Sequence, residues 1–378
     1  MIGLIGGYYL LIIISTLLLC LRYGQGTDYL AYDGIYQKIA TGKENLVHGE
    51  VGWVLLNAIC YKAGISFVQM EALLSLLEMV CLHRCIRRFS PMLCLSFLLF
   101  LLTFWFTYYC SALRQAVVLA VFLGFGLELL LKRRYILYCL VTLFLMTFHI
   151  MAVALLVLPF AVEFLPRSRR GCIVVFGLFV LACFVSWMML ICFPQISYYT
   201  KDGVTFSFKA LAMRLFLLGL IGALFMCLSK TKKESRQSVG RVFFVIYLVG
   251  IALYLMLFPS AIISQRLTAC FKAVEVILIP ILLVSVFAQK QNEISKKLKG
   301  QVPAIISVLC VLMSAEMVKN VNAEMNQSRY WGNSVLDYPY VSVFNKSSLS
   351  SERILIGDTV REPERISNKK DEAILDII

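Results

Sequence analysis

Among the arginines outside the basic clusters of this chain, three lie at the edge of a long apolar segment: Arg22, Arg114 and Arg266. An arginine at membrane depth costs free energy and is normally retained to bind an anion or a partner. A guanidinium can bind two phosphate oxygens through parallel N–H donors. Because the topology derived below places all three at one mouth of a membrane protein, they predict a site for a lipid-linked phosphate or diphosphate.

The first arginine opens the sequence Arg22-Tyr-Gly-Gln-Gly-Thr-Asp28-Tyr29, which continues to Tyr32. A helix that begins near Thr27 places Asp28 and Tyr32 on one face, and either Thr27 or Asp28 is a suitable N-cap. In the functional interpretation, Arg22 holds phosphate while Asp28 orients a sugar or accepts a proton. The alternative is a capped helix beside a surface arginine.

The second arginine, Arg114, follows a tight turn and is expected in the first turn of a returning helix, where the helix N-terminus also favours anions. Gln115 beside it adds hydrogen-bonding capacity. The alternative is an arginine that extends to the membrane interface. Arg266 has the same position at another helix start. Further along that helix, Lys272 and Glu275 have the i, i+3 spacing of an ion pair.

A histidine, His149, lies between two apolar stretches, 135–148 and 150–165. At 1.5 Å per residue each helix reaches only about 21–24 Å, so the joint is expected below the outer surface, lining a cavity. Irregular backbone is tolerated at that depth only where protein or water covers it. There His149 is either a general base for a hydroxyl or a donor to a phosphate, unless it is simply a buried core residue.

The composition indicates the membrane class that these motifs require. Hydrophobic residues make up 60% of the chain and charged residues 15%, against about 45–50% and 25% in soluble domains. The net charge of +14 does not indicate nucleic acid as a partner, because half of the lysines and arginines fall in short clusters between apolar segments. This is the positive-inside pattern, and the clusters are Arg84–Arg88, Lys132–Arg134, Arg167–Arg170, Lys230–Arg241 and Lys290–Lys299.

Placing every basic cluster in the cytoplasm predicts an all-α polytopic protein of about 11 transmembrane helices, some of them short or re-entrant. The N-terminus is then cytoplasmic, and Val51–Gly64 is re-entrant or interfacial. The remaining predicted spans are Met1–Leu21, Phe67–Leu82, Pro91–Tyr109, Ala112–Leu131, Tyr135–Phe148, Ile150–Leu165, Cys172–Phe193, Ala210–Ser229, Val242–Phe258, Leu267–Ala288 and Val302–Val318.

The chain is divided into one membrane domain (residues 1–319), an aromatic segment on its outer face (320–345) and a polar tail (346–378) with the composition of a disordered segment. Tyr338 and Tyr340 in the aromatic segment either stack on sugar rings or lie at the membrane interface. The scattered cysteines form no CxxC pair, and the sequence has no HExxH, DxD or glycine-rich phosphate loop. We therefore expect no metal and no cofactor.

Taken in order, these motifs resemble the EpsG-like family of Wzy-type bacterial polysaccharide polymerases. The resemblance rests on Arg22 to Tyr29 with Tyr32, on Arg114-Gln115, on Phe148-His149 and on Tyr338-Pro-Tyr340. It covers the chain from Arg22 to about Phe344.

The resemblance implies a C-class glycosyltransferase-like fold in the bacterial cytoplasmic membrane, with a site that faces outward. It implies a donor glycan on undecaprenyl diphosphate and a second lipid-linked repeat unit as acceptor, with a flippase and a chain-length regulator as further partners. The diphosphate is assigned to Arg22, Arg114 and Arg266, and the catalytic roles to Asp28 and His149. Glycan contacts are assigned to Tyr29, Tyr32, Gln115, Tyr338 and Tyr340.

Three other functions remain open. A ligase would use the same donor site, so the sequence does not separate it from a polymerase. A flippase or transporter would need charges along a path through the bundle, whereas here the charges gather at one mouth. A non-catalytic subunit of an export complex would tolerate the loss of Arg22, Arg114 and Asp28 together.

Overall fold

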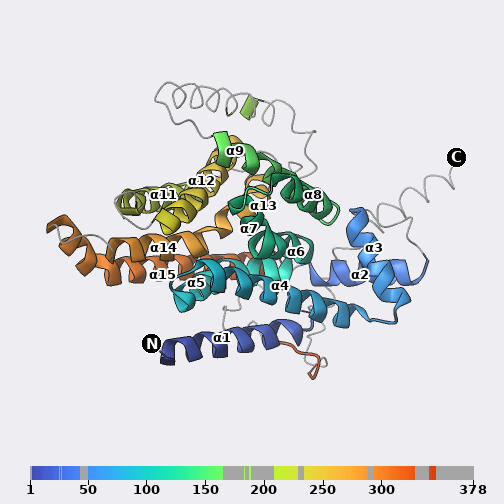
Figure 1. Cartoon of the computed structure of the whole chain (residues 1–378). Coiled ribbons are helices and arrows are strands. Elements are labelled where there is room, and N and C mark those ends of the chain that lie inside the picture. Colours follow the sequence, from blue (N-terminus) through green and yellow to red (C-terminus); the bar gives the residue numbers. More distant parts are fainter. Residues whose placement is uncertain are drawn as a thin grey trace.

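The computed structural model is helical (Figure 1), and it describes residues 2–24, 26, 28–42, 50–164, 183, 187–188, 208–228, 234–287, 293–327 and 340–345. The predicted span Cys172–Phe193 and the tail 346–378 lie outside the described residues, apart from three positions of the former. Within the described residues the backbone forms helices and no β-strand, and Arg22 pairs with Ser342 in an isolated antiparallel bridge. The prediction of an all-α membrane protein is confirmed.

The N-terminal half begins with α1 (Ile2–Cys20), which packs along α4 (Phe67–Phe89). Two short helices, α2 (Tyr29–Ala40) and α3 (Val51–Lys62), pack against each other at one side of the molecule (Figure 1). The sequence explains the start of α4, because Ser66 and Gln69 form a capping box that satisfies the first free N–H groups.

Two longer helical stretches follow, and both change helix type along their length. The first joins α5 (Leu93–Phe100) to the π-helical η2 (Leu101–Ser111). The second joins α6 (Leu113–Val121), the π-helical η3 (Phe122–Gly126) and α7 (Leu127–Leu131). Ala112 separates the two stretches, so the predicted tight turn before Arg114 is confirmed.

The predicted pair of short helices around His149 is confirmed. α8 (Tyr135–Met146) ends just before His149, and a 3-10 helix, η4 (Ile150–Val157), begins after it and continues as α9 (Leu158–Phe164). His149 itself is extended, with φ −157° and ψ 115°. The histidine therefore lies at a break between two short apolar helices.

The C-terminal half surrounds a helix that is apolar on all sides. Nearly every residue of α14 (Glu275–Phe287) is buried, which is the expected place for a helix without a polar face. It contacts α5, α12 (Glu234–Met256) and α11 (Phe208–Leu228). The last helix, α15 (Glu293–Gln327), packs on α14 and on η2.

The helix before α14 packs closely on α12. α13 (Ala261–Ala273) brings Phe271 against Gly250, where an added Cβ would lie 2.4 Å from the Cβ of Phe271. Only glycine permits this approach of the two backbones. The predicted single span Leu267–Ala288 is wrong in one respect, because α13 and α14 meet at Val274 at an angle of 42°.

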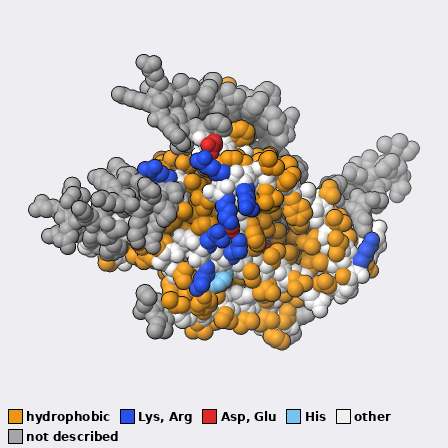
Figure 2. Space-filling model, viewed as in Figure 1, with side chains coloured by type: hydrophobic (Ala, Val, Ile, Leu, Met, Phe, Trp, Pro, Cys, Tyr) orange, Lys and Arg blue, Asp and Glu red, His pale blue; other side chains and the backbone are white. Residues whose placement is uncertain are grey.

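By length and composition, five described helices can cross a membrane, or six if the bent pair α13–α14 is one span. The predicted count of about 11 is not confirmed, since several predicted spans are shorter apolar helices, such as α1, α8 and the pair η4–α9. One face of the molecule shows lysine and arginine side chains gathered in a strip between broad hydrophobic areas (Figure 2). Several membrane-length helices and this surface define a multi-pass membrane protein.

Candidate functional site

The side chain of Glu50, at the start of α3, joins two of the predicted site residues. One carboxylate oxygen pairs with Nη1 of Arg114. The other lies 3.3 Å from Nδ1 of His149 and also accepts a hydrogen bond from the backbone N–H of Ile150. The fold thus brings Arg114 and His149 together at one carboxylate, although they lie 64 and 99 positions from Glu50 in the sequence.

The Glu50 carboxylate determines which ring nitrogen of His149 carries the proton. Burial acts to raise the pKa of Glu50, but the hydrogen bond from His149 and the charge of Arg114 outweigh it and lower the pKa from 4.5 to about 2. An ionised carboxylate only accepts, so the proton of neutral His149 lies on Nδ1. Nε2 is then an acceptor, and it is buried without a hydrogen-bond partner among the described residues.

Because the pKa of Glu50 is lower in the folded than in the unfolded chain, its ionised form stabilises the fold above pH 4.5, and this contribution is lost as the pH falls towards 2. We expect the melting temperature of detergent-solubilised wild type to fall more steeply over this window than that of Glu50→Gln. Equal slopes in the two proteins would show that Glu50 is not held by His149 and Arg114.

The backbone around Gly52 fixes the distance between Glu50 and His149. The N–H of Gly52 donates to the carbonyl of Thr147, 2.8 Å away. An added Cβ at Gly52 would lie 2.3 Å from Oγ1 of Thr147. The start of α3 therefore rests directly on the turn that precedes His149, and a larger residue does not fit there.

We expect Gly52→Ala to displace Glu50 from His149. Overpacking of this kind costs about 1–3 kcal/mol of stability, and a misplacement of about 1 Å can lower a catalysed rate about 10²-fold. Gly7→Ala is the matched control, because an added Cβ at Gly7 meets no atom within 4 Å. Thermal stability and product formation would be measured for both, and wild-type values for Gly52→Ala would show that Gly52 does not position Glu50.

Tyr32 lies beneath the guanidinium of Arg114, with the ring centroid 5.6 Å from Cζ. Its ring packs edge-on against Trp53, and both side chains are buried. Tyr29, one turn earlier on α2, is also buried and packs against Phe67. The structure thus brings Tyr32 to Arg114 and places Tyr29 in the adjoining apolar cluster.

Asp28 occupies the N-cap position of α2, as predicted, but its side chain makes no capping hydrogen bond. Gln115 donates to the backbone carbonyl of Arg266, which joins α6 to α13. The structure therefore connects Gln115 directly to the backbone of Arg266, and Asp28 lies one helical turn from Tyr32.

Arg22 lies in a different environment from Arg114. Its side chain is 1% exposed, and Nη2 is 2.8 Å from a carboxylate oxygen of Glu71. Nη1 donates to Ser75 and to the carbonyl of Leu19. Glu78, one more buried carboxylate of α4, has neither oxygen hydrogen-bonded among the described residues. The guanidinium of Arg22 is thus enclosed by protein and paired with an acid.

The segment 340–345 crosses the end of α1. Tyr23 donates its N–H to Val341, Val343 donates to Leu21, and the hydroxyl of Tyr340 donates to Leu18. Tyr340 is partly exposed beside the Arg22 pair. The predicted glycan contact Tyr338 lies outside the described residues.

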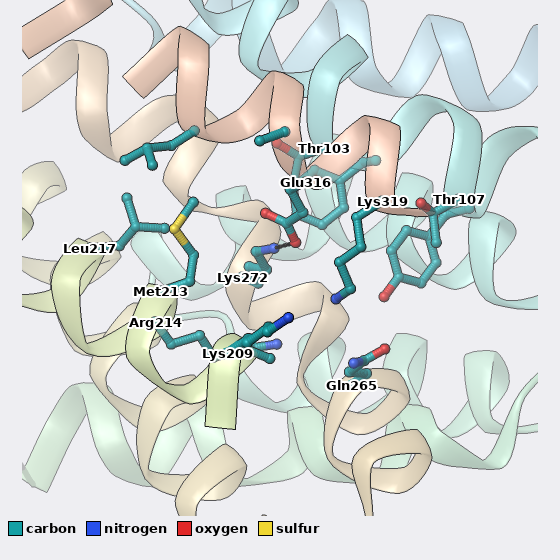
Figure 3. A pocket seen from close by; sticks show the side chains of 15 residues that line it. Thr103, Thr107, Lys209, Met213, Arg214, Leu217, Gln265, Lys272, Glu316 and Lys319 are labelled. Atoms are coloured by element: carbon teal, nitrogen blue, oxygen red, sulfur yellow. Dashed lines mark hydrogen bonds and ion pairs between the residues drawn. The ribbon is translucent and has the colours of Figure 1, made fainter. Parts of the chain in front are cut away.

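A second polar region is a pocket of about 250 Å³ between α11, η2, α13 and α15 (Figure 3). The side chains of Lys209, Arg214 and Lys319 point into the same space, and Gln265 lines its edge. Lys272 pairs here with Glu316 of α15. The predicted partner of Lys272 was Glu275, and this was wrong because Glu275 begins α14 beyond the bend of 42°.

Sequence reasoning missed Glu50 and most of the basic pocket. Glu50 precedes a short apolar helix, and nothing near it in the sequence distinguishes it from a surface acid. Arg214 carried a usable signal, since it interrupts an otherwise apolar stretch of α11. Lys209 and Lys319 resemble ordinary helix-end lysines until the fold brings their helices together.

Among the described residues there is no group of three histidine, cysteine or acidic side chains that could hold a metal ion. The chemistry open to the site is proton transfer at His149 and binding of anions by the guanidinium and amino groups.

The fold and the site together define a helical multi-pass membrane protein with a histidine–carboxylate pair and a basic pocket between its helices. The model of the EpsG family matches residues 7–328. This chain therefore belongs to the EpsG family. No curated protein and no solved structure matches the chain.

Proposed function

We propose that this protein polymerises oligosaccharide repeat units carried on undecaprenyl diphosphate at the outer face of the bacterial cytoplasmic membrane. Membership of the EpsG family supports a glycosyltransferase-like polymerase. The observation that carries the proposal is the group formed by Glu50, His149 and Arg114, in which a histidine is held with Nε2 as the acceptor.

In the proposed reaction, the acceptor hydroxyl oxygen forms a bond to the anomeric carbon of the donor sugar. The bond from that carbon to the diphosphate oxygen breaks, and lipid diphosphate leaves with the electron pair. Nε2 of His149 accepts the hydroxyl proton, while Glu50 stabilises the imidazolium that forms. Diphosphate already activates the sugar, so the step needs no nucleotide.

Arg114 takes a different role in this proposal from the one that the sequence predicts. Arg114 holds Glu50 in place through their ion pair, and Arg266 stays a candidate for binding the diphosphate. Asp28, Tyr32 and Gln115 are the candidates for contacts with the glycan. A flippase would supply the lipid-linked donor and acceptor, and a chain-length regulator would act on the product.

The test is an assay with purified protein and a synthetic undecaprenyl-diphosphate repeat unit, without nucleotide or added metal. We expect a ladder of products that differ by one repeat unit. A single product formed on a different acceptor would support the ligase instead. Transfer of intact lipid across reconstituted vesicles, without elongation, would support the transporter and overturn the polymerase.

A further inference from the structure

The pocket between α11, η2, α13 and α15 carries more positive charge than its neighbours neutralise. Its lining includes Lys209, Arg214, Lys272 and Lys319 and one carboxylate, Glu316. Even when the buried Glu275 at the start of α14 is included, the part of the chain that the structure describes sets four cations here against two acids. Like charges held close together repel one another, so this arrangement favours a bound anion with more than one negative charge.

The cations approach from three helices, so they can surround a ligand. Lys209 and Arg214 come from α11, Lys272 from α13 and Lys319 from α15 (Figure 3). Lys272 is held by Glu316, and the guanidinium of Arg214 lies 3.9 Å from the centroid of the Tyr254 ring. These contacts keep two of the cations in place before any ligand arrives, which lowers the cost of binding.

The remaining lining is suited to the rest of a lipid-linked ligand. Leu217, Met213 and Leu312 form an apolar side, and Thr103 and Thr107 supply hydroxyls. The membrane-length windows of α11 and α15 are each 17% buried, against 72% for Leu113–Leu131. The pocket therefore lies between two helices at the periphery of the bundle, where an attached apolar chain can reach the lipid.

The pocket also adjoins the proposed site of proton transfer. Gln265 lines it, and the carbonyl of the next residue, Arg266, accepts the hydrogen bond of Gln115 beside Arg114. Its lining residues come from the helix ends that the basic clusters predict to face outward. A ligand in this pocket and a hydroxyl at His149 would thus lie on the same side of the membrane.

We infer that this pocket binds the diphosphate end of a prenyl-linked substrate, separately from the acceptor region at His149. The inference rests on the proposed function and adds a donor site made by Lys209, Arg214, Lys272 and Lys319. A phosphate chain with several charges fits the excess of cations, and the apolar side accepts the first carbons of the prenyl group.

Binding to detergent-solubilised full-length protein tests the inference, with farnesyl diphosphate as the probe and calorimetry as the measurement. We expect Lys209→Gln with Lys319→Gln to weaken binding at least about tenfold, because each lost charge-assisted contact removes affinity. Both side chains are exposed, so the double variant should keep the wild-type melting temperature. Lys132→Gln with Arg133→Gln is the matched control, since it removes two charges elsewhere and should leave binding unchanged.

Two further ligands identify what the pocket recognises. Farnesol should bind at least about tenfold more weakly than farnesyl diphosphate, because it lacks the charge. Inorganic diphosphate should also bind more weakly, because it lacks the apolar chain. Equal affinity for farnesyl diphosphate in the pocket and control variants overturns the inference, and so does inorganic diphosphate binding as tightly as the prenyl ester.

These experiments distinguish a failure of the proposed donor site from a failure of the proposed polymerase function. Pocket-dependent binding of farnesyl diphosphate, with no elongation of the undecaprenyl-linked repeat unit, supports the donor site and overturns the proposed function. Elongation by the Lys209→Gln/Lys319→Gln variant with wild-type KM overturns the donor site and supports the proposed function.

Discussion

Replacing His149 with alanine is expected to lower the rate of polymer formation by about 10²–10⁴-fold, the usual loss when a general base is removed. Nε2 of His149 is the buried acceptor that receives the proton in the proposed step. The affinity for farnesyl diphosphate should stay at its wild-type value, because the donor pocket does not include His149. The rate would be measured from the early appearance of the two-repeat product.

Two variants serve as controls for this result. His83→Ala removes a histidine whose Nδ1 lies 2.9 Å from the hydroxyl of Tyr8, remote in the chain from the site, and should keep the wild-type rate. Added imidazole should restore part of the rate of His149→Ala and none of the rate of a misfolded protein. If His149→Ala elongates at the wild-type rate, the histidine is structural and the proposed mechanism is wrong.

Glu50 acts through His149, and its replacement distinguishes a positioning role from a merely structural one. We expect Glu50→Gln to lower kcat while KM for the donor stays the same, because the amide no longer stabilises the imidazolium. The same variant tests the pH dependence of stability described above.

Replacing Glu71 with alanine is expected to destabilise the protein by about 3–5 kcal/mol, because it leaves the buried charge of Arg22 without its partner. The pair is almost completely enclosed, with exposed fractions of 1% and 2%. The free energy of unfolding would be measured by titration of the solubilised protein with a denaturing detergent.

The exposed pair of Arg133 and Glu163, 3.7 Å apart, is the matched control. Arg133→Gln should cost about 0–1 kcal/mol, as expected for a solvated ion pair. A cost for Glu71→Ala as small as this would show that Arg22 is solvated.

A charge-free variant, Arg22→Met with Glu71→Leu and Glu78→Gln, tests the predicted diphosphate role of Arg22. It should recover most of the stability lost in Glu71→Ala, since apolar replacement of a buried ion pair is often neutral. If Arg22 is only structural, this variant keeps its affinity for farnesyl diphosphate. A folded variant that no longer binds the probe would support the diphosphate role that the sequence predicts.

Features with a local physical cause were predictable. The break at His149 follows from two apolar stretches that are each too short to cross a membrane, and the position of Arg114 follows from the turn before α6. The bend between α13 and α14 was missed, because no glycine or proline, the usual sign of a break, lies next to Val274. The predicted span count was not confirmed, since hydropathy does not separate a crossing helix from a short packed one.

The candidate site was predictable only where a polar residue interrupts apolar sequence. Arg22, Arg114 and His149 stand out in this way. Their partners Glu50 and Glu71 do not, because they are ordinary acids until helices from distant parts of the chain pack together, and the same holds for Glu316, the partner of Lys272. Lys272 shows the limit of predicting ion pairs from sequence. Helical spacing favoured Glu275 as its partner, but helix packing brought Glu316 to it instead.

By itself the sequence determined the class of the protein and the positions of Arg114 and His149 at helix starts. These depend on hydropathy, charge and turn chemistry, which act between neighbours in the chain. Only the tertiary structure decided that Arg22 is neutralised by Glu71, that Glu50 joins Arg114 to His149, and that several lysines share one pocket with Arg214. The reason is that uniformly apolar helices do not specify their neighbours by pattern, so the pairing of their few charges depends on how the whole bundle packs.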